Sequence, residues 1–188
     1  MSGPSGSPHA YWKVPFEWPG TRAPRGEPQA PLVTWDEAAD VPELRQLVAG
    51  VLADSVDPSD NAAVAALGPH GAAGWILSPP EGFGYRPEWW QVLRYGGTAA
   101  GFVLPVVFDG CARDGLDEAT IYHMGVAPGY RGRGLARLLL RAATSSLCDH
   151  GVWRIYCDTA AANAAMIHVF ESEGWRRLPA TERPVVLP

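Results

Sequence analysis

The stretch Val126-Ala-Pro-Gly-Tyr-Arg-Gly-Arg-Gly-Leu-Ala136 lies between a predicted strand and a predicted helix. The strand covers 119–126, where β-favouring residues end at an Ala-Pro-Gly turn. The helix covers 135–149, where leucines recur at helical spacing. Amide groups at a helix start lack partners and carry a partial positive charge, and Gly132 and Gly134 let an anion approach the backbone closely. The stretch therefore predicts a site for a phosphate or pyrophosphate group.

Two other phosphate-binding patterns do not fit this stretch. A P-loop needs Gly-Lys followed by Ser or Thr, but Leu135 follows Gly134 here. The dinucleotide-binding fingerprint needs Gly or Ala where the chain has Arg137. A solvated turn before an amphipathic helix stays open as an alternative, because the chain is rich in arginine: of its 15 basic residues only Lys13 is a lysine.

A second pattern follows the first. Asp158-Thr-Ala-Ala-Ala-Asn163 precedes a predicted helix, and Ile167-His-Val-Phe-Glu-Ser-Glu-Gly-Trp175 ends it. Together with Arg131-Gly-Arg-Gly-Leu-Ala136, this order resembles the GNAT superfamily of N-acetyltransferases. That family has a [Gln/Arg]-x-x-Gly-x-[Gly/Ala] acyl-CoA loop, then a strand acid, an Asn at a helix start and an aromatic-Glu-x-x-Gly-aromatic ending. The resemblance covers about 32–188 and is strongest from 119 to 176.

The resemblance implies an α/β (α+β) fold, with a mixed, mostly antiparallel sheet flanked by helices and splayed around an acyl-CoA site. It implies one acyltransferase domain over 32–188. We expect a hairpin at Gly96-Gly97, a bulge or edge at Pro105 and a long loop over 68–87. The other expected strands cover 32–35, 89–95, 99–108, 153–159, 175–178 and 185–187, and the other expected helices cover 41–53, 59–67 and 163–172.

Residues 1–31 are predicted to form a Pro/Gly-rich arm without helix or strand periodicity. Seven of the chain's 18 prolines lie here. The arm also holds Tyr11, Trp12, Phe16 and Trp18, and disordered tails are poor in aromatic residues. We therefore expect the arm to pack on the domain surface or on a partner subunit, with a loose arm as the alternative.

The resemblance assigns a set of residues to acyl-CoA. Backbone groups of 124–126 are implied to pair with the pantetheine arm, and the amides of 132–137 are implied to hold the pyrophosphate. A glycine within a strand, as at Gly125, marks a bulge or a close approach. Asn163 is implied to contact the pantetheine, and it equally fits a plain helix cap. The assigned residues are Met124, Gly125, Val126, Arg131, Gly132, Arg133, Gly134, Leu135, Ala136, Arg137 and Asn163.

An alkylammonium acceptor has a pKa near ~10.4 and must lose a proton before it attacks a thioester. The resemblance places Asp158 where the ribosomal-protein N-terminal acetyltransferases have a glutamate base. Being one methylene shorter, Asp158 would act through water, or would simply cap the following turn. Glu118 and Tyr122 are the other catalytic candidates, on the face that the two-residue period gives to Glu118, Thr120, Tyr122 and Met124. The same period points His123 to the other face, as a packed or solvated side chain.

One residue departs from the family pattern. Family members commonly carry a tyrosine on the last helix as the acid for the leaving thiolate, whereas this chain has Phe170. A thiol of pKa ~8.5 is a good leaving group, so the acid is dispensable. Tyr122, Tyr156 or water would substitute for it.

Composition narrows the class of protein. With 188 residues, 47% of them hydrophobic, and a net charge of −5, the chain is neither disordered nor a general nucleic-acid binder. No run approaches the ~18 apolar residues of a membrane span. Cys111, Cys148 and Cys157 show no metal-ligand spacing, so we expect no metal. Their odd number and the absence of a signal peptide favour a cytoplasmic location.

The leading hypothesis is transfer of acetyl from acetyl-CoA to a primary amine of a small molecule, by direct attack in a ternary complex. The acidic stretch over 36–60 would attract a cationic amine, or is a solvated face. Three alternatives stay open. The chain acetylates a protein N-terminus or lysine, or binds acyl-CoA without transferring the acyl group, or is an unrelated anion-binding or interaction module. Nothing in the sequence decides whether it forms a homodimer, which is common among relatives.

Overall fold

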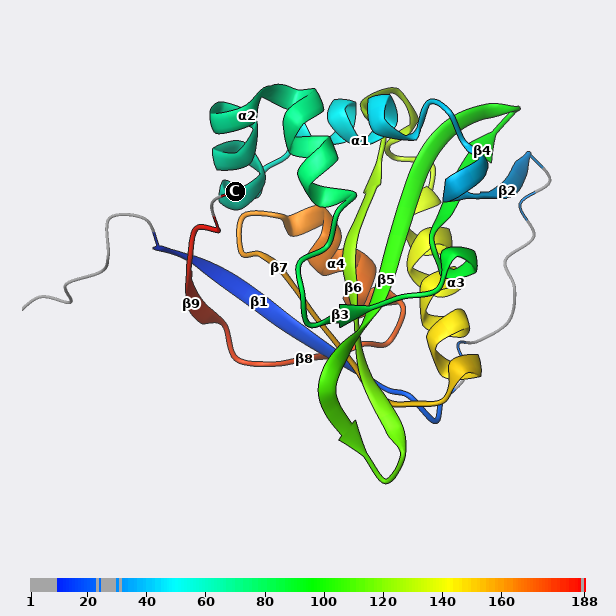
Figure 1. The fold of residues 1–188 in the computed structure, drawn as a ribbon, viewed down its shortest axis with the longest axis vertical. Helices are drawn as coiled ribbons and strands as arrows, with labels where there is room; N and C mark the ends of the chain where they lie inside the picture. Colours follow the sequence, from blue (N-terminus) through cyan, green and yellow to red (C-terminus); the bar gives the residue numbers. More distant parts are fainter. Residues whose placement is uncertain (1–9, 23, 25–29, 31, 187) are drawn as a thin grey trace, which may run out of the picture.

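A single mixed sheet organises the chain, whose computed structural model describes residues 10–22, 24, 30, 32–186 and 188 (Figure 1). The strands are β1 (Ala10–Pro19), β2 (Val33–Glu37), β3 (Phe83–Gly84), β4 (Gln91–Tyr95), β5 (Thr98–Arg113), β6 (Leu116–Val126), β7 (Val152–Ala160), β8 (Arg176–Arg177) and β9 (Thr181–Pro184). The helices are α1 (Leu44–Leu52), α2 (Pro58–Ile76), α3 (Leu135–His150) and α4 (Ala164–Ser172).

The strands run in the order β2-β4-β5-β6-β7-β1-β8, with β3 beside β5 and β9 beside β1. Among the described pairs only β6 and β7 are parallel, which confirms the expected mixed, mostly antiparallel sheet. Helices cover both faces of the sheet. A Cβ on Gly125 would meet α1 and a Cβ on Gly101 would meet α3, and the register of β5 with β6 puts these two positions on opposite faces. None of the helices in the described ranges is long and apolar enough to cross a membrane.

The parallel strands separate soon after they meet. β6 and β7 pair only from Asp117 with Val152 to Ala119 with Ile155, although the strands continue to Val126 and Ala160. Beyond Ala119 the edge of β6 that faces β7 has no strand partner among the described residues. The expected splay of the sheet is therefore present, and we call this region the divergence.

A bulge in β6 lies at the divergence. Leu104 pairs with His123 while the next residue, Pro105, pairs with Ile121, so Tyr122 is an extra residue in β6. Proline has no N–H to donate to a neighbouring strand, which explains why the pairing is interrupted here. The bulge expected at Pro105 is confirmed.

The N-terminal segment is not an arm over its whole length. Residues 10–19 form β1, which pairs with β7 on one side and with β8 and β9 on the other. Val14, Phe16 and Trp18 are at most 2% exposed, a two-residue period that Pro15 and Pro19 obscured in the sequence. The prediction of an irregular arm is wrong for this segment, because aromatic and β-branched side chains bury one face of it. Residues 1–9 and most of 23–31 lie outside the described residues.

Two further differences concern the ends of elements. α2 continues through the predicted loop to Ile76, because only Gly68 leaves the helical backbone (φ 68°) and Pro69 fits the first turn of the following helical segment. The predicted strand over 185–187 is wrong for the described residues there, and β9 lies instead at Thr181–Pro184.

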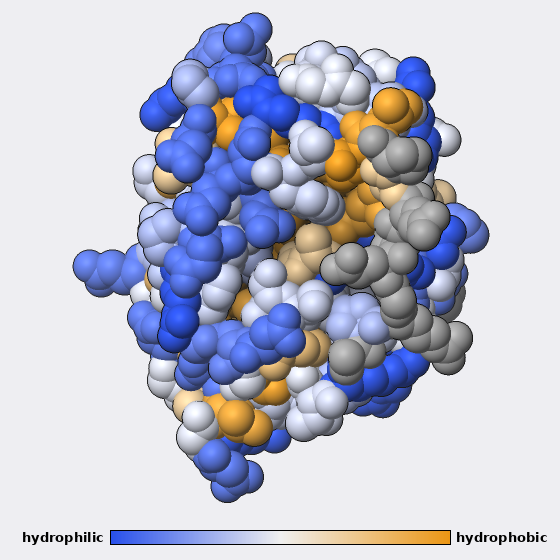
Figure 2. Space-filling view, turned by 90° about the vertical axis from the view of Figure 1, so that its right-hand side faces the viewer, coloured by the Kyte–Doolittle hydropathy of each residue, from blue (hydrophilic) through white to orange (hydrophobic). Residues whose placement is uncertain are grey.

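On the face shown in Figure 2, apolar residues gather toward the upper part and hydrophilic residues cover much of the rest.

Candidate active site

The loop between β6 and α3 has an open backbone. Gly132 and Gly134 have φ of 74° and 76°, and a Cβ at either position would meet nothing within 4 Å. Among the described residues no hydrogen bond engages the amide groups of 132–136, and no side chain caps α3. Free amides at the start of a 16-residue helix provide the arrangement that binds phosphate groups.

The arginines of this stretch have different partners. Arg131 braces the loop: its Nε donates to the carbonyl of Val126 at 3.1 Å, and its guanidinium pairs with Asp54. The Arg133 guanidinium lies 5.3 Å from the ring centre of Tyr95. Neither contact uses the loop amides, so these side chains leave the backbone site open.

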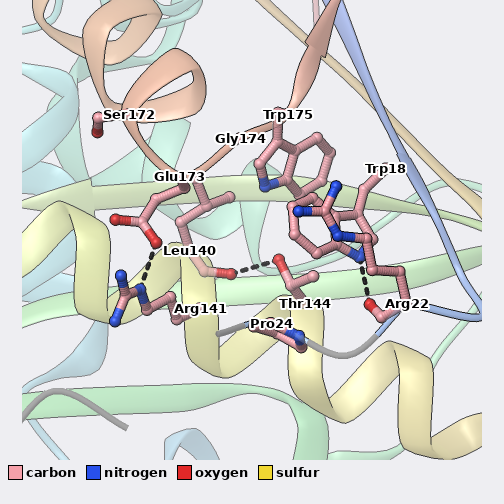
Figure 3. A pocket seen from close by; sticks show the side chains of 10 residues that line it. All are labelled: Trp18, Arg22, Pro24, Leu140, Arg141, Thr144, Ser172, Glu173, Gly174 and Trp175. Carbon is pink, nitrogen blue, oxygen red and sulfur yellow. Dashed lines mark hydrogen bonds and ion pairs between the residues drawn. The ribbon is translucent and has the colours of Figure 1, made fainter. Parts of the chain in front are cut away.

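Arg137 and Arg141 share one carboxylate, that of Glu173. The Nε of Arg137 lies 2.6 Å from one carboxylate oxygen of Glu173. Arg141 pairs with the other oxygen, and this second contact is drawn in Figure 3. Burial alone would raise the pKa of Glu173, but the bonds and charges of the two arginines outweigh it and lower the pKa. This pairing could not be predicted from local sequence, because Glu173 lies more than 30 residues beyond both arginines.

The end of β6 is held closely by α1. A Cβ on Gly125 would lie 2.3 Å from Cγ1 of Val51, so the close approach expected at Gly125 is to a helix. Met124, Gly125 and Val126 pair with β5 through one edge, which leaves their other edge toward the divergence. Asn163 caps α4 by accepting from the amide of Met166 at 3.1 Å.

Cys157 lies where the pairing of β6 and β7 stops. The amide of Ile121 donates to its Sγ at 3.3 Å. Burial raises the pKa of Cys157 to about 12. The thiol therefore stays protonated at neutral pH, which makes it a poor nucleophile.

The bulge changes which side chains share a face. Paired residues of neighbouring strands point to the same face, and Leu104 and Pro105 point to opposite ones. His123 therefore lies on the face of Glu118 and Thr120, and Met124 on the opposite face. The prediction from an uninterrupted two-residue period is wrong for both, because the extra residue shifts the period.

The three catalytic candidates do not form one cluster. Glu118 pairs with Arg154 one residue before the last β6–β7 pair, so its carboxylate is held where the strands are still joined. The Tyr122 ring lies 5.4 Å from that of Phe83, and burial raises the pKa of Tyr122. Asp158 lies beyond the last β6–β7 pair and accepts from Nζ of Lys13 at 2.9 Å. Of the three, only Asp158 is part of a polar network beside the divergence.

That network, which we call the polar cluster, draws residues from four parts of the chain. Lys13 also lies 3.7 Å from Asp57. The Tyr11 hydroxyl donates to Asp57 at 2.8 Å. Its other members are Ser55, Ser59, Asp60, His123 and Asp158. Sequence reasoning missed it because β1 was taken as an arm and His123 was placed on the wrong face.

Phe170 belongs to the core rather than to this network. Its ring is 3% exposed and stacks on Phe16 at 4.6 Å between centroids. It also meets Trp175 at 5.1 Å. The position therefore joins α4 to β1 and offers no proton donor.

Comparison with known proteins agrees with this geometry. Residues 70–175 match the acetyltransferase (GNAT) family. A [ribosomal protein bS18]-alanine N-acetyltransferase of Salmonella typhimurium is 40% identical over 60 residues, 32% of this chain and 40% of that protein. A mycothiol acetyltransferase of Propionibacterium freudenreichii is 33% identical over 79 residues, 42% of this chain and 24% of that protein. The matched stretches thus span less than half of either relative.

The fold is similar to that of solved structures as well. The ribosomal-protein-S18-alanine N-acetyltransferase from Escherichia coli aligns with a TM-score of 0.52 and 19% identity, over 83% of this chain and 94% of that one. The family match covers more than half of the chain, and it includes the free-amide loop and the divergence. The chain therefore belongs to the GNAT family of acetyltransferases.

Proposed function

We propose that the chain transfers an acetyl group from acetyl-CoA to a primary amine of a small molecule, by direct attack in a ternary complex. The observation that carries the proposal is the row of free amides at 132–136 beside the divergence of β6 and β7. When bound there, acetyl-CoA would supply a thioester as the acyl donor.

The residues of this chain fit such a cosubstrate. The amides of 132–136 would hold the pyrophosphate, because they have no partner within the described part of the chain and the two positive-φ glycines leave space above them. The free edge of Met124, Gly125 and Val126 would pair with the amide groups of the pantetheine arm. Asn163, which caps α4 after β7, would contact the pantetheine arm from the side of β7.

The state of Cys157 supports direct attack. A covalent acyl-enzyme requires a nucleophile that is ionised or next to a base. Cys157 is the cysteine at the divergence, and its protonated thiol is held by the amide of Ile121 rather than by a base. An amine that attacks the thioester itself needs no such group.

The polar cluster supports a small cationic acceptor. Asp57, Asp60 and Asp158 bring three carboxylates together against one lysine, which favours an approaching cation. Contacts also occupy the side of the polar cluster at Ser59, whose Oγ lies 3.1 Å from the Tyr11 hydroxyl and accepts from the amide of Val186 at 3.0 Å. A compact acceptor suits this surface better than an extended peptide.

The second candidate function is acetylation of a protein N-terminus. It is favoured by the similarity to the bS18-alanine N-acetyltransferases. The mycothiol acetyltransferase among the relatives is named for mycothiol, and a streptothricin acetyltransferase of Streptomyces lavendulae, 34% identical over 56 residues, is named for streptothricin. Both candidates use the same cosubstrate and differ in the size of the acceptor.

Thiol release from acetyl-CoA tests the proposal, with a panel of small alkylamines and peptides that carry a free N-terminal alanine. We expect turnover with one or more small amines and weaker turnover with the peptides. A preference for the peptides would support the second candidate. Tight CoA binding without turnover on any amine would contradict both, and absence of CoA binding in calorimetry would leave an anion-binding module.

A further inference from the structure

His123 lies on β6 beyond its last pair with β7, on the same face of the sheet as Asp158. We infer that His123 accepts the proton of the acceptor amine and that Asp60 is its positioning residue. The inference rests on the proposed function and assigns the base of that reaction.

The contacts of the ring favour one form of the imidazole. Nε2 lies 3.1 Å from Oδ1 of Asp60, whose other oxygen accepts from the Ser55 hydroxyl at 2.5 Å. Burial alone would raise the pKa of Asp60, but His123 and Ser55 outweigh it and keep the pKa below its usual value. An ionised carboxylate only accepts, so Nε2 carries the hydrogen and the lone pair of a neutral ring lies on Nδ1.

Nδ1 is the unexplained atom of the pair. It is buried and has no hydrogen-bond partner among the described residues. Leaving a buried polar atom unpaired costs about 1–3 kcal/mol, so the arrangement needs a reason. An N–H of the acceptor, or one water held by it, supplies the missing donor. The ring is fixed for that contact, since it also stacks on Phe102 at 6.0 Å.

Asp158 is poorly placed to take this proton itself. The Lys13 ammonium holds its carboxylate at 2.9 Å. Burial lowers the pKa of Lys13, but Asp158 and Asp57 outweigh burial and raise it, so the ion pair is intact at neutral pH. His123 contacts the charged group of Asp60 of α2, and Lys13 of β1 acts on Asp60 from further away. β5 contributes the uncharged ring of Phe102.

The proton balance is simple. The acceptor ammonium gives one proton to Nδ1, and its freed electron pair forms the C–N bond at the thioester carbon. When the C–S bond breaks, the electron pair leaves with sulfur, and the thiolate takes the second proton from the new C–N nitrogen. The imidazolium, stabilised by Asp60, then returns its proton to water. One ammonium thus yields an amide, a thiol and one proton.

The test compares two histidine–carboxylate pairs. His150, at the end of α3, provides the matched control. Its Nε2 lies 3.2 Å from Oδ2 of Asp117, which is on β6 before the strands diverge. We expect His123→Gln to lower kcat/KM for an alkylamine by about 10²-fold, Asp60→Asn by about tenfold, and His150→Gln by less than twofold. The CoA affinity of all three variants stays within twofold of the wild-type value.

A second acceptor separates proton transfer from folding. With an acyl hydrazide, whose terminal nitrogen is neutral at pH 7, the deficit of His123→Gln falls below tenfold, whereas a structural defect would reduce the rates with both acceptors equally. As a readout independent of activity, ¹⁵N spectra of the unliganded protein show the His123 ring with hydrogen on Nε2, and Asp60→Asn shifts its signals.

Three results overturn the assignment: His123→Gln within threefold of wild type on the alkylamine, an equal loss on both acceptors, or a ring with hydrogen on Nδ1. If His123→Gln loses CoA affinity through misfolding, Asp60→Asn carries the same comparison. A wild-type protein that is inactive with every amine contradicts the proposed function, whereas an active wild type with an unaffected His123→Gln contradicts the assignment alone.

Discussion

Gly125 offers the sharpest test of how α1 packs beside the divergence. In Gly125→Ala the new methyl would lie 2.3 Å from Cγ1 of Val51, whereas carbon atoms in contact are about 3.5–4.0 Å apart. Strand and helix must separate by more than about 1 Å, or the Val51 side chain must leave its rotamer. Overpacking of this kind lowers the free energy of unfolding by about 1–3 kcal/mol.

A double-mutant cycle isolates the contact. Val51→Ala alone removes two buried methyl groups, at about 2 kcal/mol. In that background the Gly125→Ala methyl meets Cβ of Val51 at 3.4 Å, close to ordinary contact, so the second change costs little. We therefore expect the double variant to be more stable than the sum of the single effects by about 1–2 kcal/mol.

Urea unfolding measures each free energy by linear extrapolation. Gly50→Ala is the control, because a Cβ at this position in α1 meets nothing within 4 Å. It should raise stability by about 0.5–1 kcal/mol through helix propensity. Strictly additive effects of Val51→Ala and Gly125→Ala would refute the close contact between α1 and β6.

Three further predictions concern β1, the loop and the pH dependence of stability. Phe16→Ala lowers the free energy of unfolding by about 3–5 kcal/mol, because Phe16 is fully buried. Trp12→Ala is the control and changes this free energy by less than about 0.5 kcal/mol, because Trp12 is 56% exposed. Equal effects of the two substitutions in urea unfolding would contradict the packing of β1 in the core. Gly134→Ala forces alanine to φ 76° at a cost of about 1–2 kcal/mol and weakens CoA binding about tenfold in calorimetry. Gly129→Ala, in the same loop, leaves the CoA affinity unchanged. Equal CoA affinities of the two variants would count against the loop site. The pKa of Asp60 is lowered in the folded state, so its ionised carboxylate stabilises the fold at pH values above the unfolded pKa of ~3.9, and this stabilisation is lost as the pH falls through the folded pKa. The difference in unfolding free energy between wild type and Asp60→Asn is therefore larger at pH 7 than at pH 2.5. The same difference at both pH values would contradict the lowered pKa.

Local patterns predicted the elements that depend on local chemistry. The strand, glycine turn and helix around 126–136 follow from glycine and amide geometry within one stretch of chain, and the bulge follows from a proline without an N–H. The hairpin that joins β4 to β5 likewise depends on two adjacent glycines, Gly96 and Gly97, whose φ values are 57° and 83°. Such features need no knowledge of distant segments.

Features that depend on two distant segments were not predictable in this way. The face of His123 depends on where the extra residue of β6 falls, which only its register with β5 reveals. The partner of Arg137 and Arg141 comes from the end of α4, and the partner of Asp158 comes from β1. Prolines in the N-terminal segment also masked a two-residue period that the core of the sheet requires.

The most direct measurement is a titration of the ¹⁵N-labelled protein with CoA, followed by amide chemical shifts. The central claim is that the loop amides and the free edge of β6 form the cosubstrate site. We predict the largest shifts at 132–136 and 124–126, with the pocket between β1, α3 and α4, lined by Trp18, Thr144 and Trp175, unaffected (Figure 3). Largest shifts at that pocket, or no shifts at millimolar CoA, would contradict the claim.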